Sequence, residues 1–202
     1  MPTSHKIIYG MYLIVWGIMA INPKYPQDWL LENVLIFIFF PFIVWMDAQH
    51  RYTLLSIIFL LLFASLHSLG AHYTYAEMEH FDLITQLFGF ERNHFDRLVH
   101  FLFGLLVFRM LFEMLSNAAM TVKAALLFTF TMIVFISTLY EQLEWLVAVL
   151  FHPELGMAFL GTQGDVWDAH KDTGLAMMGA FINIVFYKSY AVLWQLRHSK
   201  TL

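Results

Sequence analysis

Long apolar runs alternate with short polar segments along this chain. Because a helix needs about 20 mostly apolar residues to cross the hydrocarbon core of a membrane, each long run is a candidate span. The pattern predicts six transmembrane helices, at residues 6–22, 29–46, 53–75, 96–115, 122–151 and 172–194. At about 1.5 Å per residue, the fifth is roughly 45 Å long and must tilt, break or project from the membrane.

The chain is predicted to form one integral membrane domain over residues 1–202, because no repeat, low-complexity tract or linker interrupts it. Its first run, within Met1–Ile21, has the weakly basic start and apolar stretch of a signal peptide. No small-x-small cleavage site follows this run, so we expect a retained first helix. The predicted fold is therefore an all-α polytopic membrane bundle of about six helices.

The basic residues predict how the bundle is oriented, since cytoplasmic loops carry an excess of Lys and Arg. With the N-terminus inside, seven basic residues fall on the cytoplasmic side and four on the other. This excess predicts that both termini are inside. The seven are Lys6, Arg51, Arg109, Lys123, Lys188, Arg197 and Lys200, and the four are Lys24, Arg92, Arg97 and Lys171.

Composition supports a membrane location and excludes several other classes of protein. Apolar types make up 60% of the chain and charged types 13%, about half the charge of an ordinary globular domain. The mean hydropathy is +0.65. Because the 11 basic residues are scattered, no basic stripe can follow a phosphate backbone, and we expect no nucleic-acid partner. The absence of cysteine excludes disulfides, thiolate nucleophiles and Fe–S clusters.

The acidic residues are distributed far less evenly than the basic ones. On the predicted topology, only Asp47 and Glu113 of the 15 acids lie inside. A charged group that faces lipid costs at least about 2.5 kcal/mol, so acids within spans should point into the bundle. Residues three or four apart share a helix face, and three such pairs lie at a similar outer depth: Asp96 with His100, Glu141 with Glu144, and Asp168 with Asp172.

So many carboxylates packed together would repel one another unless protons, basic residues or a metal ion neutralised them. Oxygen and imidazole ligands without sulfur suit a divalent Zn, Mn, Fe or Mg ion. We therefore predict a divalent metal site in the outer half of the bundle. Its candidate ligands are His67, Asp96, His100, Glu141, Asp165, Asp168 and Asp172.

Other polar residues receive different predicted roles. Glu144 is the candidate general base towards a bound water. The acids Asp28 and Glu32 are expected to form a solvated helix start. Substrate binding or charge balance is assigned to three basic side chains, Arg92, Arg97 and His72.

The segment 159–168 reads FLGTQGDVWD and is the most informative loop. Gly161 and Gly164 permit a tight bend, and Asp165 and Asp168 follow directly. We interpret it as a rigid loop that directs two carboxylates into an outer cavity. The alternative is a plain connection in which Trp167 anchors the membrane interface.

Three blocks of the sequence resemble the YjdF family of bacterial inner-membrane proteins, and the resemblance covers nearly the whole chain. The blocks are FDRLVHF at 95–101, YEQLEW at 140–145 and GTQGDVWD at 161–168. The resemblance implies a multi-pass protein of the bacterial inner membrane. More distantly, the blocks are similar to VanZ-like proteins, which are linked to glycopeptide-antibiotic tolerance. There the second block usually reads Glu-x-x-Gln, whereas this chain has Glu141 and Glu144.

Three functional hypotheses follow from this pattern. The first is an envelope-facing, metal-dependent enzyme that acts on a lipid or lipid-linked substrate. The second is a cation- or proton-coupled transporter, against which stands the absence of an inverted repeat. The third is a structural or partner-binding membrane protein whose polar groups order the helices. Membrane lipid is the expected partner in each case, and a homo-oligomer is a further candidate.

Overall fold

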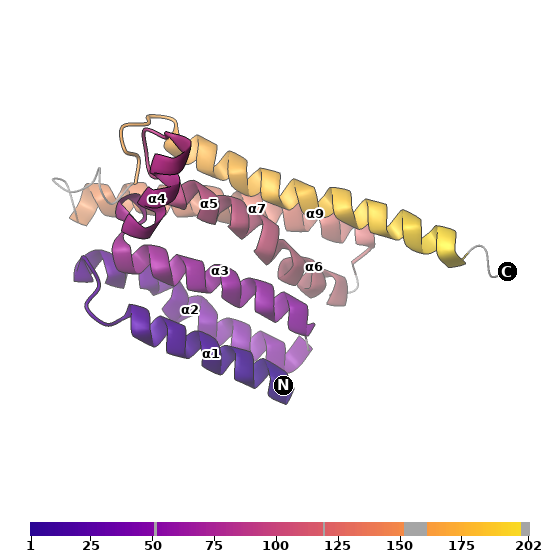
Figure 1. Cartoon of the computed structure of the whole chain (residues 1–202). Coiled ribbons are helices and arrows are strands. Elements are labelled where there is room, and N and C mark those ends of the chain that lie inside the picture. The colour runs from indigo at the N-terminus through magenta and orange to yellow at the C-terminus, as the bar shows by residue number, and fades with distance from the viewer. Residues whose placement is uncertain (51, 119, 152–160, 199–202) are drawn as a thin grey trace.

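A computed structural model describes residues 1–50, 52–118, 120–151 and 161–198, and within these ranges every regular element is a helix (Figure 1). A Thr53 side chain that accepts from the amide of Ser56 caps the third helix. The elements are α1 (Thr3–Met19), α2 (Pro26–His50), α3 (Leu54–Tyr73), the 3-10 helix η1 (Tyr75–Glu77), α4 (Glu79–Phe88), α5 (Phe95–Leu102), the π-helix η2 (Phe103–Val107), α6 (Phe108–Asn117), α7 (Val122–Phe151) and α9 (Asp168–His198).

The predicted all-helical membrane class is confirmed. Four segments of the described chain are long and apolar enough to cross a membrane: Pro26–Gln49, Leu54–Tyr73, Phe95–Asn117 and Val122–Leu150. They correspond to the second to fifth predicted spans. The predicted sixth span lies within α9, and the predicted first span, 6–22, overlaps α1 but runs three residues past its end at Met19. The start of the informative loop, residues 159 and 160, lies outside the described residues.

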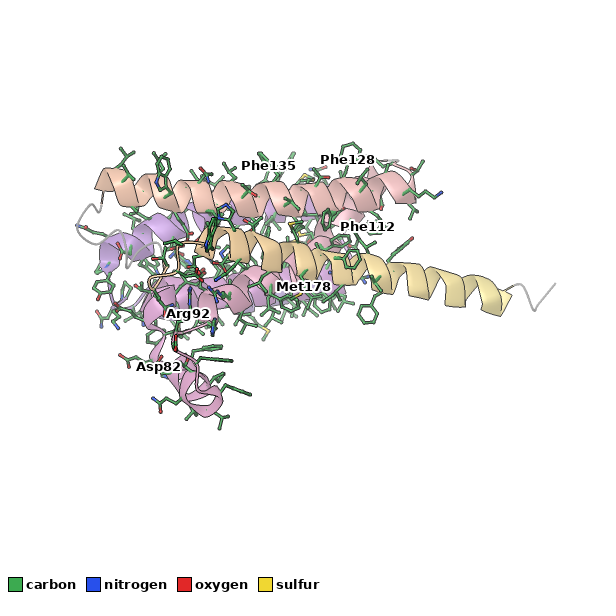
Figure 2. All side chains as sticks on the ribbon, turned by 90° about the horizontal axis from the view of Figure 1, so that it is seen from above. Asp82, Arg92, Phe112, Phe128, Phe135 and Met178 are labelled. Atoms are coloured by element: carbon green, nitrogen blue, oxygen red, sulfur yellow. The ribbon has the colours of Figure 1, made fainter. Side chains whose placement is uncertain are left out.

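The helices run back and forth along a common axis (Figure 1). Helix α3 packs against α1 and η2, and α9 packs against α5, η2 and α7. The N-terminal end of α1 and the C-terminal end of α9 lie at the same end of the bundle (Figure 1). Large apolar side chains such as Phe128 and Phe135 lie on the outside of α7 (Figure 2). This outer surface suits contact with lipid hydrocarbon.

The fourth predicted span differs from a plain α-helix, because a π-helix separates α5 from α6. Here the backbone approaches α9 closely: a Cβ on Gly104 would collide with the carbonyl of Ala176, and one on Gly179 with the carbonyl of Phe101. Asn183 Nδ2 donates to the Leu105 carbonyl at 2.8 Å. Small residues at this crossing therefore bring α9 close enough to position its acidic first turn beside α5.

Polar groups gather at the two ends of the bundle. At the end that holds the N-terminus, His5 Nδ1 lies 2.8 Å from Asp47 Oδ2, which joins α1 to α2. The other Asp47 oxygen accepts from the amide of Tyr52 at 3.2 Å. The opposite end carries α4 and the acids described next.

Candidate functional site

Two loops that are far apart in sequence are joined at the end of the bundle opposite the N-terminus. The amide of Asn93 donates to Gln163 Oε1 at 2.9 Å, and Gln163 Nε2 donates to the Asn93 carbonyl at 2.9 Å. Asn93 Oδ1 also accepts from the amide of Phe95, where α5 begins. Gly161 and Gly164 in this loop have φ values of +63° and +87°, a region that favours glycine. The reciprocal bonds fix the segment before α9 against the start of α5.

Arginines hold two of the acids in this region. Arg92 Nη1 donates to Asp168 Oδ1 at 2.5 Å and Arg92 Nη2 to Asp168 Oδ2 at 3.3 Å, a two-point pairing. Arg92 also donates to the carbonyls of Gly161 and Thr162. Arg97 Nη2 contacts Asp165 Oδ2 at 2.5 Å and Asp168 Oδ1 at 3.0 Å. Both guanidinium groups therefore pair with carboxylates of the loop and of α9.

Three buried aspartates form the acid cluster, which consists of Asp96 of α5 and Asp168 and Asp172 of α9. One carboxylate oxygen from each lies within 4.8 Å of the other two. Asp172 is 1% exposed, and its Oδ1 has no hydrogen-bond partner among the described residues. A buried carboxylate oxygen without a donor is costly, so this atom is a candidate ligand for a cation.

Imidazole and glutamate side chains border the acid cluster. His100 Nε2 lies 3.6 Å from Asp96 Oδ1 and 3.2 Å from Glu141 Oε1, and Ser137 Oγ is 3.5 Å from His100 Nδ1. Glu144 is buried and interacts electrostatically with Asp96 and Asp172 among others. His100 therefore links Asp96 of its own helix to Glu141 of α7.

A second buried chain of hydrogen bonds runs beside this group. Tyr140 Oη donates to Glu32 Oε2 at 2.5 Å, and Tyr75 Oη lies 2.5 Å from His67 Nδ1. His67 Nε2 is 3.2 Å from the carbonyl of Glu32. The expectation that Asp28 and Glu32 form a solvated helix start is wrong, because each is only 8% exposed. Glu32 faces inward since α7 supplies a phenol donor for it.

An apolar cavity of about 300 Å³, the inner cavity, begins at this polar group and extends between the helices. Its walls are largely aliphatic and aromatic side chains, including Phe40, Phe63 and Phe103. Cavities of this size fall at the lower end of the range for ligand sites. The polar groups that line it at the end near the acid cluster are His67, Tyr75, Asp96, His100, Ser137 and Tyr140.

The predicted site residues thus separate into groups. Asp96, Asp168 and Asp172 come together, and His100, Glu141 and Glu144 border them. Asp165 and His67 lie nearby but have other partners, and His72 lies elsewhere, since its Nδ1 contacts the carbonyl of Met19 where α1 ends. Sequence reasoning missed Glu32, Tyr75, Tyr140 and Gln163.

The pKa values of two groups outside the spans, Asp165 and His94, are shifted by their neighbours in this arrangement. Hydrogen bonds from Lys171 and the Trp167 amide, together with Arg97, hold the pKa of the Asp165 carboxyl well below its usual range. Burial lowers the pKa of His94, and the charges of Arg97 and Arg92 lower it further. Asp165 is therefore ionised and His94 neutral at pH 7.

These apolar helices and the lipid-facing exterior define a multi-pass integral membrane protein. The chain belongs to the family described as "Predicted membrane protein (DUF2238)", whose model matches residues 4–192. It is similar to "Inner membrane protein YjdF" of Escherichia coli (strain K12), with 31% identity over 184 residues, which covers 87% of this chain and 83% of that relative. No solved structure matches the chain. The resemblance to the YjdF family is confirmed, and with it the location in the bacterial inner membrane.

Proposed function

We propose that this protein is a metal-dependent enzyme that acts on a lipid or lipid-linked substrate at the outer face of the inner membrane. One observation carries the proposal: Asp96 belongs to the acid cluster and also lines the inner cavity. A group that can hold a cation therefore adjoins an apolar space inside a membrane protein. This combination suits a substrate with a hydrocarbon chain and a polar head.

The acid cluster supports a divalent metal by its chemistry. Asp96, Asp168 and Asp172 offer oxygen ligands, which suit Mg, Mn, Zn or Fe. The partnerless Oδ1 of Asp172 is the second indication, because a cation would satisfy it. Arg92, Arg97 and Lys171 already pair with Asp165 and Asp168. Within the acid cluster, Asp96 and Asp172 have no arginine or lysine partner among the described residues.

The inner cavity supports a hydrocarbon ligand that enters from the bilayer. Its α2 side includes Phe39 and Phe42, which are about half exposed, and its α7 side includes Met132 and Ile136. Helix α2 packs on α3, whereas α7 packs on α6 and α9. A lipid whose hydrocarbon chain entered between α2 and α7 would bring its polar head to the polar end of the inner cavity.

The remaining residues suggest how the site would work. A bound divalent ion would polarise the substrate head and a water molecule. Glu144 would take the proton of that water and return it to the leaving oxygen of a hydrolysed bond. His100, between Asp96 and Glu141, would keep these carboxylates oriented.

The topology completes the proposal. We propose six spans with both termini inside, because α1, α2, α3, the α5–η2–α6 unit, α7 and α9 pass along the same axis in alternating directions (Figure 1). Both chain ends then lie at the end that holds Asp47, and the acid cluster faces the outside.

Elemental analysis of detergent-purified protein tests the metal. We expect near-stoichiometric divalent metal in the wild type and in the exposed-acid control Glu79→Gln, and its loss in the nearly isosteric Asp172→Asn. Metal that persists in Asp172→Asn, or no metal in the wild type, would overturn this assignment.

A second experiment tests the reaction. Wild type, Glu144→Gln and chelator-treated protein are each incubated with an extract of membrane lipids, and products are followed by mass spectrometry. We expect turnover only in the untreated wild type, with metal retained in Glu144→Gln. A wild type without metal or turnover but with pH-dependent cation uptake in liposomes would favour a transporter. Loss of thermal stability as the sole effect of Asp172→Asn would favour the structural hypothesis.

A further inference from the structure

Helix α4 carries an apolar face that the rest of the described chain does not cover. Leu83 and Leu87 are 73% and 76% exposed, and Phe88 is also exposed. On the other side, Asp82 accepts a hydrogen bond from Asn93 Nδ2. The helix projects from the outer end of the bundle, as the position of Asp82 in Figure 2 shows. An amphipathic helix at this depth lies in the membrane interface with its apolar face among the lipids.

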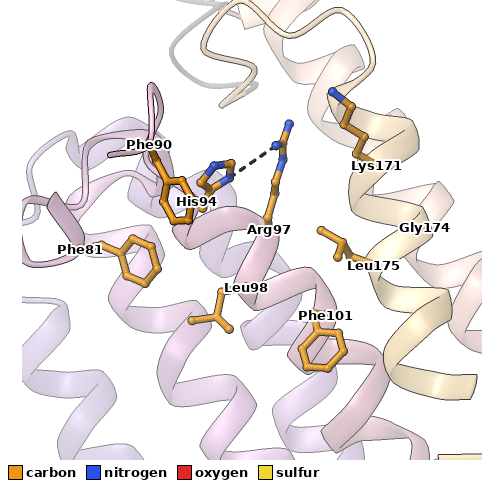
Figure 3. Close-up of a pocket in the computed structure, with 9 residues that line it drawn as sticks. All are labelled: Phe81, Phe90, His94, Arg97, Leu98, Phe101, Lys171, Gly174 and Leu175. Carbon is orange, nitrogen blue, oxygen red and sulfur yellow. Dashed lines mark hydrogen bonds between the residues drawn. The ribbon is translucent and has the colours of Figure 1, made fainter. Parts of the chain in front are cut away.

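A groove of about 680 Å³, the surface groove, lies between α4, α5 and α9, outside the inner cavity (Figure 3). Along α5 and α9 its wall is apolar, formed by Leu98, Phe101 and Leu175. Phe81 and Phe90 form the aromatic side towards α4. The groove therefore continues from the interface alongside two helices that enter the membrane.

The charges in the surface groove have one sign. Arg97 and Lys171 line it at its outer end, and none of the described carboxylates does. Lys171 is half exposed and uses one of its three N–H groups on Asp165. Arg97 reaches Asp165 and Asp168 through Nη2, while its Nη1 approaches His94 Nδ1 at 3.4 Å. Cationic donors thus remain available at one end of an apolar groove.

We propose that the surface groove binds one anionic phospholipid of the outer leaflet. Its phosphate lies at Lys171 and Arg97, and an acyl chain lies along Leu98, Phe101 and Leu175. The membrane location supplies the occupant, since the groove opens where headgroups meet hydrocarbon. The exposed face of α4 holds the groove at that depth. No member of the acid cluster lines the groove, so this lipid is distinct from the proposed substrate. Arg97 is shared between the two sites, since it also contacts Asp168.

Gly174 allows a direct test, because a Cβ there meets no atom within 4 Å and a larger side chain can fill the groove. Gly10 of α1 is equally open and remote from the groove, so Gly10→Leu is the matched control. Lys171→Gln removes one cationic group that is outside the proposed catalytic machinery. One basic residue near a membrane surface contributes about fivefold in affinity for anionic lipid.

Native mass spectrometry of the purified protein, titrated with phosphatidylglycerol or phosphatidylcholine, measures this binding. We expect one retained phosphatidylglycerol in the wild type and Gly10→Leu, about fivefold weaker retention in Lys171→Gln, and none in Gly174→Leu. Equal retention of phosphatidylcholine, or unchanged binding in both groove variants, would overturn the proposal. Displacement of the lipid by inorganic phosphate at equal concentration would also overturn it, since the site would then select a soluble anion.

Discussion

Arg92 and Asp168, 76 residues apart, form a two-point ion pair that fastens the α4–α5 loop to the start of α9. Both side chains are nearly buried, at 11% and 4% exposure. Removal of one partner from a buried pair leaves an uncompensated charge, which costs more than the pair itself contributes. The same pair orients Asp168 within the acid cluster, so fold and site depend on one contact.

Replacement of that arginine tests the contact. We expect Arg92→Ala to lower the free energy of unfolding by about 3–5 kcal/mol, and Arg92→Lys to lower it less, because lysine keeps the charge but loses the two-point geometry. Thermal unfolding in detergent provides the measurement, with the exposed Lys123→Ala as control. Equal stability of Arg92→Ala and Lys123→Ala would contradict the prediction.

The crossing of α9 with the π-helix gives a second prediction. An added methyl at Gly104 would collide with the Ala176 backbone, whereas one at Gly174 meets open space. We expect Gly104→Ala to destabilise the protein by about 1–3 kcal/mol. Gly174→Ala should be neutral or stabilising by up to about 1 kcal/mol, because alanine favours the helix. Comparable melting temperatures for the two variants would show that the helices are not in such close contact.

The Tyr140–Glu32 bond gives a third prediction. Removal of the Tyr140 hydroxyl leaves a buried Glu32 oxygen without this donor, which costs about 1–3 kcal/mol, so Tyr140→Phe should destabilise the protein by that amount. Tyr25 donates to Glu77 in the same way but on the surface, at 3.3 Å, which makes Tyr25→Phe the matched control with a smaller effect. A double-mutant cycle with Glu32→Gln measures the interaction, and strict additivity would refute a direct bond.

The lowered pKa of Asp165 predicts that the stability of the protein depends on pH. Its pKa is held below the ordinary value of 3.8, mainly by Lys171, so the native protein binds this proton less readily than the unfolded chain. The carboxylate therefore contributes stability above about pH 4, and that contribution is lost as the pH falls towards the lower folded value. The difference in melting temperature between wild type and Asp165→Asn should be positive at pH 7 and shrink at pH 3. A constant difference over this range would contradict the assignment.

The proposed topology is open to direct labelling, because the chain contains no cysteine. We expect an impermeant thiol reagent applied from outside to label His80→Cys in α4 and to leave Asn117→Cys at the end of α6 unlabelled. Both positions are exposed, so reagent access is comparable. Labelling of Asn117→Cys alone would show that the bundle has the opposite orientation, with the acid cluster on the inside.

The sequence by itself determined the helical membrane class, because the cost of exposing polar backbone and side chains to lipid forces long apolar helices. It also determined that Asp96 pairs with His100 and that Asp168 and Asp172 share a face, since helical periodicity fixes neighbours three or four residues apart. Local rules of this kind need no knowledge of the rest of the chain.

Only the tertiary structure decided which helices deliver their polar groups to one place. Glu32 follows Asp28 at a helix start and has the pattern of a solvated position, yet Tyr140, 108 residues away, supplies its donor. His72 has the residue type and the depth of a site member, but α3 packs against α1, and the His72 ring lies against the Met19 carbonyl at the end of α1. The inner cavity likewise takes its walls from helices far apart in sequence, among them α2 and α7. Such contacts depend on helix packing, which apolar periodicity leaves open because many arrangements bury the same residues.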